Sequence, residues 1–340
     1  MSDSAYTIGI DIGGTNTVVG AVGHDGRCVL RTSFPTTSEK TAEDFVARIA
    51  LCIRDLCTQL PLQFSLLGIG VAAPAARHRE GSVRNPANLP WGTVNLVAML
   101  KGHFNLPIAL TNDSNAAALG ELYYGAGRGR SDFVAMTLGT GLGSGIIVDG
   151  KLLYGSNDLA GELGHVILEE DGRECGCHRR GCAETYVSAS GLRRTAFELL
   201  AQENEESVMR DISFSNLTAR KIFDFAIGGD LLAAKAFQIT GKYLGRLLVN
   251  AVTAYDPEAI ILSGGLMESG DLLLNPTREY FNENLLSLYK GGVEIIKSGL
   301  PNNDAAILGA SSLIGYTTQA LQAGASGSSK PPGKRAVLAH

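Results

Sequence analysis

Several features are missing from the 340-residue sequence, and each absence argues against a class of protein. The chain has no apolar run long enough to cross a membrane. We also expect no signal peptide, because the polar segment 1–5 leads directly into a predicted strand. Positive charge is not in excess, since 29 Lys and Arg against 34 Asp and Glu give a formal charge of −5. We therefore expect a cytoplasmic protein that contacts neither membranes nor nucleic acid, because a nucleic-acid partner requires a basic face.

Two glycine-rich turns are present, but neither ends in the Gly-Lys-Ser/Thr of a Walker-type loop. The first, 11–17, joins predicted strands at 6–12 and 17–23, and the second, 139–143, joins strands at 131–138 and 144–148. Both turns lie in hairpins, whereas the glycine turn of a dinucleotide-binding Rossmann unit opens a helix. Their backbone N–H groups can bind phosphate. This repeat predicts two similarly built α/β domains that face each other across a nucleotide.

The first turn also carries Asp11, with Thr15 and Thr17 as further hydroxyl donors. A carboxylate repels phosphate unless a cation lies between them. We therefore expect Asp11 to face a magnesium ion and to contact it through water. An ordinary hairpin with a capping Asp is the alternative.

Polar side chains follow the short predicted strand 107–110 and begin an Ala-rich helix. These are Asn112, Asp113, Ser114 and Asn115. Such residues can cap the free N–H groups of a helix or face a ligand beyond the carboxyl ends of a sheet. The glycine turns on either side in sequence favour the second interpretation, with Asp113 facing the acceptor of a phosphoryl group. The loop 73–91 with its single Trp91 fits either a sugar-binding surface or simple packing of the ring.

The segment 159–184 contains one His and three Cys between glycines: His165, Cys175, Cys177 and Cys182. In the cytosol, cysteines are thiols or metal ligands rather than disulfides. This set predicts a closed, structural Cys₃His zinc site. His178 is a competing ligand, but its position next to Cys177 makes the geometry cramped. A zinc-bound His165 would present its other ring nitrogen to a substrate oxygen.

Together these motifs resemble the ROK family of bacterial sugar kinases and repressors, within the actin, hexokinase and Hsp70 superfamily. The resemblance extends from about residue 6 to residue 316. It implies an α/β fold of two actin-like (ribonuclease H-like) ATPase domains with an interdomain cleft. The small domain would comprise 1–113, completed by a C-terminal helix at about 304–322, and the large domain with the zinc loop 114–303. The composition of 323–340 predicts a disordered tail.

The resemblance also implies roles for individual residues, with Asp113 as the catalytic base. The sugar contacts would be Asn88, Asn112, Asp113, Glu162, His165 and Glu184. The nucleotide contacts would be Asp11, Gly13, Gly14, Thr15, Asn16, Thr17, Gly139, Thr140, Gly141, Gly264 and Gly265. One departure is visible, because His178 stands where the family's zinc loop usually has Gly.

These features predict ATP-dependent phosphorylation of a hexose, with glucose 6-phosphate as the expected product and with Mg²⁺ and structural Zn²⁺. Fructose, mannose, allose and N-acetylmannosamine are alternative substrates, and polyphosphate is an alternative donor. A sugar-sensing repressor is the other class, but the first glycine turn begins so early that we expect no DNA-binding segment before it. The resemblance implies a homodimer or homotetramer.

Overall fold

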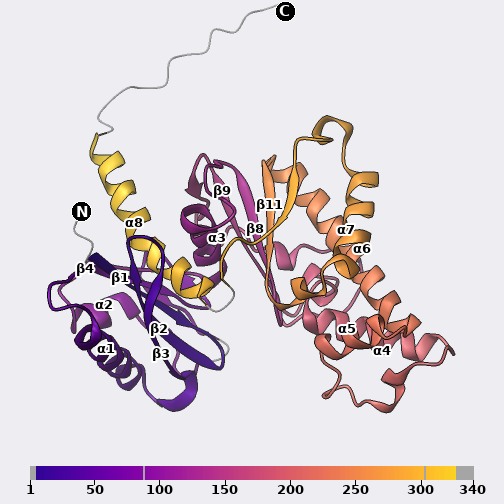
Figure 1. Ribbon diagram of the computed structural model, residues 1–340, viewed down its shortest axis with the longest axis horizontal. Coiled ribbons are helices and arrows are strands. Elements are labelled where there is room, and N and C mark those ends of the chain that lie inside the picture. Colours follow the sequence, from indigo (N-terminus) through magenta and orange to yellow (C-terminus); the bar gives the residue numbers. More distant parts are fainter. Residues whose placement is uncertain (1–4, 87–88, 302–303, 327–340) are drawn as a thin grey trace, which may run out of the picture.

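The computed structural model describes residues 5–86, 89–301 and 304–326, which form two five-stranded sheets (Figure 1). The first sheet consists of β1 (Ala5–Ile12), β2 (Asn16–Gly23), β3 (Cys28–Pro35), β4 (Ser65–Ala72) and β7 (Ile108–Thr111). The second consists of β8 (Phe133–Leu138), β9 (Leu142–Val148), β10 (Lys151–Leu152), β11 (Ala259–Ser263) and β12 (Glu294–Lys297). Within the described ranges no helix is both long and apolar enough to span a membrane.

The two sheets have the same strand order and the same strand directions. The first runs β3-β2-β1-β4-β7 and the second runs β10-β9-β8-β11-β12. In each, three antiparallel strands are followed by two strands parallel to the third. Each glycine hairpin therefore occupies an equivalent place, which confirms the prediction of two similarly built halves.

Two helices, α3 (Asp113–Tyr124) and α8 (Ala305–Ser326), pack against each other between the sheets (Figure 1). Helix α8 lies on β1 and β4, and α3 lies on β8 and β9. Helix α8 lies very close to the first sheet. A Cβ atom at Gly9 would overlap the backbone of Ile307, and a Cβ atom at Gly70 would overlap the backbone of Ala310. Alternation along β1 turns Ile8 and Ile10 to the other face.

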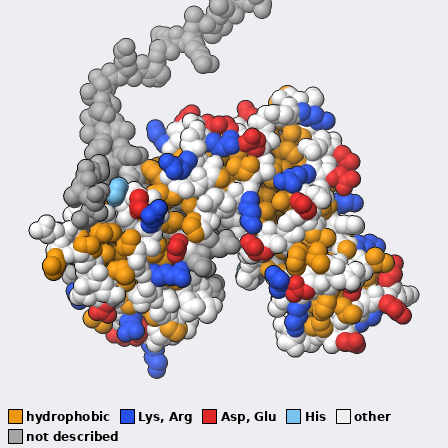
Figure 2. Space-filling view, in the orientation of Figure 1, with side chains coloured by type: hydrophobic (Ala, Val, Ile, Leu, Met, Phe, Trp, Pro, Cys, Tyr) orange, Lys and Arg blue, Asp and Glu red, His pale blue; other side chains and the backbone are white. Residues whose placement is uncertain are grey.

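The remaining helices cover the outer faces of the sheets. Helices α1 (Ala42–Gln59) and α2 (Leu96–Lys101) pack on the first sheet. The second sheet shares a hydrophobic core with α4 (Ala189–Gln202), α5 (Ala219–Ile227), α6 (Leu231–Tyr255) and α7 (Asp271–Asn284), in which α4, α5 and α7 pack on α6. Figure 2 shows the two parts of the molecule separated by a notch along the lower edge of the view.

Helix α4 begins at Ala189, because Ser188 caps it and residues 183–185 form a separate 3-10 turn. Two predicted boundaries need correction. The expected loop 73–91 contains a small hairpin of β5 (Ala76–Arg77) and β6 (Ser82–Val83). Helix α8 continues to Ser326, so the disordered tail does not begin at 323, and residues 327–340 lie outside the described ranges.

Candidate functional site

The strand-to-helix junction at the start of α3 presents the predicted base. The Asn112 side chain caps the helix by accepting a hydrogen bond from the Ser114 backbone N–H at 2.8 Å. Asp113 is exposed, and its Oδ1 accepts bonds from the Ser114 N–H at 2.8 Å and hydroxyl at 3.3 Å. Among the described residues, Oδ2 has no hydrogen bond or ion pair. The junction therefore combines both interpretations, since Asn112 caps the helix and Asp113 presents a carboxylate oxygen to solvent.

Thr36 holds the first glycine turn through two hydrogen bonds to its backbone. Its hydroxyl donates to the Gly13 carbonyl at 2.7 Å, and its N–H donates to the Thr15 carbonyl at 2.9 Å. Gly14, Thr15 and Asn16 are exposed. Thr17 is fully buried, and its hydroxyl lies 3.0 Å from that of Thr36. The Thr17 hydroxyl therefore stabilises the turn from within, and a contact of this residue with the nucleotide stays a prediction.

Asp11, the last residue but one of β1, lies close enough to Asp113 for their charges to interact. Burial, with a smaller contribution from the negative charge of Asp113, raises the pKa of Asp11 from 3.8 to about 6. Two neighbouring carboxylates repel each other unless a cation lies between them. Oxygen ligands of this kind are those that Mg²⁺ prefers in proteins. The pair could therefore hold a magnesium ion, either directly or through water.

The second glycine turn lies between the start of α3 and Glu184. A Cβ atom at Gly143 would overlap the Ser114 hydroxyl, and a Cβ atom at Gly141 would overlap Glu184 Oε2. The same Glu184 oxygen accepts a hydrogen bond from the Leu142 N–H at 2.9 Å. The structure thus brings a phosphate-type turn, the Asp113 junction and a predicted sugar-binding carboxylate together.

The third glycine turn adjoins the second. Gly264 follows β11 with a φ of 94°, a left-handed conformation that favours glycine, and a Cβ atom there would overlap the Leu138 backbone. The hydroxyls of Thr137 and Ser263 lie 3.1 Å apart at the ends of the paired strands β8 and β11. Gly264 and Gly265 therefore lie beside the turn that starts at Gly139.

His165, Cys175, Cys177 and Cys182 converge, with their ligand atoms all within 4.8 Å of one another. Cys177 Sγ lies 3.6 Å from Cys182 Sγ, and Cys175 Sγ lies 3.7 Å from His165 Nδ1. Metal–sulfur bonds of about 2.3 Å at a tetrahedral angle place two sulfurs roughly 3.8 Å apart. The predicted ligand set is therefore arranged as a zinc ion requires, and His178 does not belong to it.

The three thiols differ in how readily they lose their protons when no cation is bound. Hydrogen bonding to Arg179 lowers the pKa of Cys177 to about 6, whereas burial raises the pKa of Cys182 to about 12. Metals bind the thiolate form. A bound cation would stabilise all three thiolates at once, and four protein ligands would leave no open position on zinc.

Glu162 and His165 extend from a 3-10 turn, Leu163–His165, that packs on β9. His165 Nδ1 faces Cys175, and its Nε2 lies 4.0 Å from a Glu162 oxygen. The buried Ser144 hydroxyl holds this turn, because it donates to the Gly161 carbonyl and accepts from the Leu163 N–H at 3.2 Å. The two bonds flank Glu162. In the sequence, Ser144 is only one residue of a glycine-rich strand, and nothing in that strand indicates that its hydroxyl holds the turn that bears Glu162.

Three further predictions concern loops. His178 adopts a φ of 65°, so the position does have the left-handed backbone that favours the glycine expected there. Trp91 is 8% exposed and packs on Phe45 at 5.3 Å, which favours the packing alternative for this ring. Asn88 lies outside the described residues.

Comparison with known proteins agrees with this arrangement. The model of the ROK family matches residues 7–316. A glucokinase from Halalkalibacterium halodurans is 33% identical over 328 residues, which cover 95% of this chain and 99% of the relative. The solved ROK family glucokinase from Streptomyces griseus in complex with glucose and AMPPNP has a TM-score of 0.74 and 32% identity, with 91% of this chain and 98% of that chain covered.

Relatives of another kind also match. The xylose repressor of Bacillus subtilis is 28% identical over 315 residues, which cover 92% of this chain and 77% of the repressor. The fold is the actin-like fold of two α/β domains that the sequence predicts, and its structural neighbours include ROK kinases. With a family match over nearly the whole length and a paired-sheet fold to support it, the chain belongs to the ROK family.

Proposed function

We propose that the protein is an ATP-dependent sugar kinase that converts glucose to glucose 6-phosphate, with Asp113 as general base. One observation carries the proposal. Asp113 stands beside a glycine turn whose Leu142 N–H is bonded to Glu184, so a sugar held by Glu184 would place a hydroxyl near both base and phosphate turn. The glucokinase relative and the glucose-bound structural neighbour support the same assignment.

The chemistry follows from the positions of these groups. Ser114 fixes one oxygen of Asp113, and the other would accept the proton of the sugar hydroxyl as that oxygen attacks the γ-phosphorus. Backbone N–H groups of the turns at 13–16 and 139–141, with Gly264 and Gly265 under the adenosine, would bind ATP. Mg²⁺ beside Asp11 would neutralise the charge that develops on the phosphoryl oxygens.

Glu162, His165 and Glu184 would form the sugar-binding wall of the large domain, and Asn88 and Asn112 would face it from the small domain. We assign the small domain to 1–113 with α8 and the large domain to 114–303. Closure of the notch between them would exclude water, which otherwise competes as acceptor. Zn²⁺ held by His165 and the three cysteines would orient His165 so that Nε2 faces the sugar. The enzyme would act in the cytoplasm as a homodimer or homotetramer.

A sugar-sensing protein without kinase activity is the second candidate, and the xylose repressor relative favours it. The exposed Asp113 carboxylate between phosphate-type turns favours the kinase, because a sensor needs a sugar pocket but no proton acceptor beside a nucleotide site. Other hexoses and polyphosphate are the alternative substrates.

The test is a coupled ADP-release assay with ATP and Mg²⁺ over glucose, fructose, mannose, allose and N-acetylmannosamine, with polyphosphate as a second donor. We expect glucose to give the highest kcat/KM. Turnover of another hexose alone would keep the kinase and change its substrate. Sugar binding without turnover of any hexose, by folded and zinc-loaded protein, would contradict the kinase and favour the sensor.

A further inference from the structure

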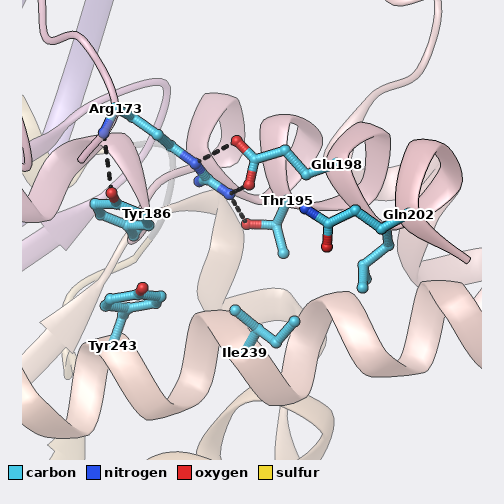
Figure 3. A pocket seen from close by; sticks show the side chains of 8 residues that line it. Arg173, Tyr186, Thr195, Glu198, Gln202, Ile239 and Tyr243 are labelled. Carbon is cyan, nitrogen blue, oxygen red and sulfur yellow. Dashed lines mark hydrogen bonds and ion pairs between the residues drawn. The ribbon is translucent and has the colours of Figure 1, made fainter. Parts of the chain in front are cut away.

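Arg173 is an almost buried arginine outside the predicted catalytic, sugar, nucleotide and metal residues. Its side chain is 8% exposed, and it precedes Cys175 by two residues. Nε and Nη2 donate to the two carboxylate oxygens of Glu198 on α4, and Nη2 also donates to the Thr195 hydroxyl at 2.9 Å (Figure 3). The arginine therefore connects α4 to the start of the loop that carries Cys175, Cys177 and Cys182, which we call the metal loop.

The same side chain reaches the segment that carries Glu184. Nη1 donates to the Thr185 carbonyl at 2.7 Å and to the Gly191 carbonyl at 3.2 Å. The guanidinium lies 4.4 Å from the Tyr186 ring centroid, and the Arg173 N–H donates to the Tyr186 hydroxyl at 3.0 Å. Every guanidinium nitrogen thus has an acceptor, and two of these acceptors are carbonyls that lysine could not bind in the same fork.

Thr185 directly follows Glu184 in the 3-10 turn Ala183–Thr185, so the Arg173 bond fixes the backbone on one side of that carboxylate. On the other side, Cys182 belongs to the metal cluster. We propose that Arg173 is a positioning residue that holds Glu184 for sugar binding by joining the metal loop, Thr185 and α4. This inference rests on the proposed function, because it assigns Glu184 to the sugar.

The chain provides a matched control. Arg246 on α6 also pairs with a carboxylate, Glu169, at 2.7 Å, but among the described residues it makes no hydrogen bond to Thr185 or Gly191. A small pocket of about 90 Å³ lies beside Arg173, between Leu199, Gln202 and Ile239. A lysine or methionine side chain at position 173 therefore fits without overpacking.

The experiment measures glucose affinity by titration calorimetry and the KM values for glucose and ATP in Arg173→Met, Arg173→Lys, Glu198→Gln and Arg246→Met. Bound zinc is quantified in each preparation. We expect Arg173→Met to weaken glucose binding on the order of tenfold. Losses of this size are typical when a residue that orients a binding side chain by hydrogen bonds is removed. The KM for ATP and the zinc content should not change. Arg173→Lys and Glu198→Gln should give smaller losses, and Arg246→Met should match the wild type.

Glucose affinity within twofold of wild type in folded Arg173→Met would overturn the inference, even if its Tm falls. Equal increases in both KM values would also overturn it, because they indicate a general structural effect. If Arg173→Met does not fold, Arg173→Lys and Glu198→Gln decide by the same criteria. Wild-type protein that binds glucose without turning it over would contradict the proposed kinase and still test Arg173. Wild-type protein that binds no sugar would overturn both.

Discussion

The Leu142 N–H donates a hydrogen bond of 2.9 Å to the carboxylate of Glu184. This bond joins the second glycine turn to the end of the metal loop, two segments that are 42 residues apart in sequence. The bond therefore places a predicted sugar-binding carboxylate directly beside the turn that we assign to phosphate binding.

Gly141→Ala should weaken glucose binding, because the added Cβ atom would overlap Glu184 Oε2 and displace the carboxylate. We expect the KM for glucose to rise on the order of tenfold, as one misplaced polar contact costs about 1–2 kcal/mol. Gly139→Ala is the matched control, because nothing lies within 4 Å of a Cβ atom there. Steady-state kinetics should show no rise in the glucose KM of the control. An equal rise in both variants would refute the explanation.

Ser144→Ala should also act on the sugar side of the site. It removes the hydroxyl that holds the carbonyl of Gly161 and the N–H of Leu163, so the turn bearing Glu162 loosens. The free energy of unfolding should fall by about 1–3 kcal/mol, since two buried polar groups lose their partner. Ser312→Ala removes a buried hydroxyl bond of 2.7 Å to Gly309 in α8, so it controls for stability alone. Only Ser144→Ala should raise the glucose KM, and equal glucose KM values in the two variants would contradict this role.

His178→Gly should stabilise the metal loop, because His178 adopts a left-handed φ of 65° without being a ligand. Relief of backbone strain, less the entropy that glycine adds to the unfolded chain, gives about 0.5–1 kcal/mol. Urea unfolding of the zinc-loaded protein measures the gain. His178→Ala separates the causes, since it removes the imidazole and keeps the strained backbone. A gain of the same size in His178→Ala would show that the backbone is not responsible.

Asp11→Asn should stabilise the ligand-free protein at neutral pH while it abolishes activity. The pKa of Asp11 is about 6 in the fold and 3.8 when unperturbed, so the folded state binds more protons between those values. Stability that Asp11 contributes in its protonated form is thus lost as pH rises from about 4 to 6. Above pH 6 the wild type should be about 2–3 kcal/mol less stable than Asp11→Asn, and near pH 4 the difference should vanish. Thermal unfolding without Mg²⁺ or nucleotide across this range measures it, and parallel pH curves would contradict the assignment.

The sequence predicted much of the fold because its regular elements follow strong local patterns. Apolar residues recur at steps of three and four through the helix Ala42–Gln59. The predicted strands 6–12 and 17–23 match β1 and β2 within one residue. Helix α7 was not predicted, because Pro276 interrupts its interior. It forms nevertheless because tertiary packing against Gly241 of α6 accommodates the proline ring.

The metal cluster was predictable because its ligands are close in sequence and separated by glycines. The roles of Arg173 and Ser144 were not, because each depends on partners that only folding brings near, such as the Thr185 carbonyl and the Leu163 N–H. The burial of Thr17 was not predictable either. Its place in a glycine turn indicated a ligand contact, but strand pairing buries it against Thr36.

The central claim is that Asp113 acts as the base, and single-turnover phosphoryl transfer by Asp113→Asn tests it most directly. The asparagine keeps an oxygen for the Ser114 N–H but cannot accept the proton of the sugar hydroxyl. We predict that transfer slows by about 10²–10⁴-fold, while glucose and ATP still bind with wild-type affinity by calorimetry. Transfer within tenfold of the wild-type rate would contradict the account.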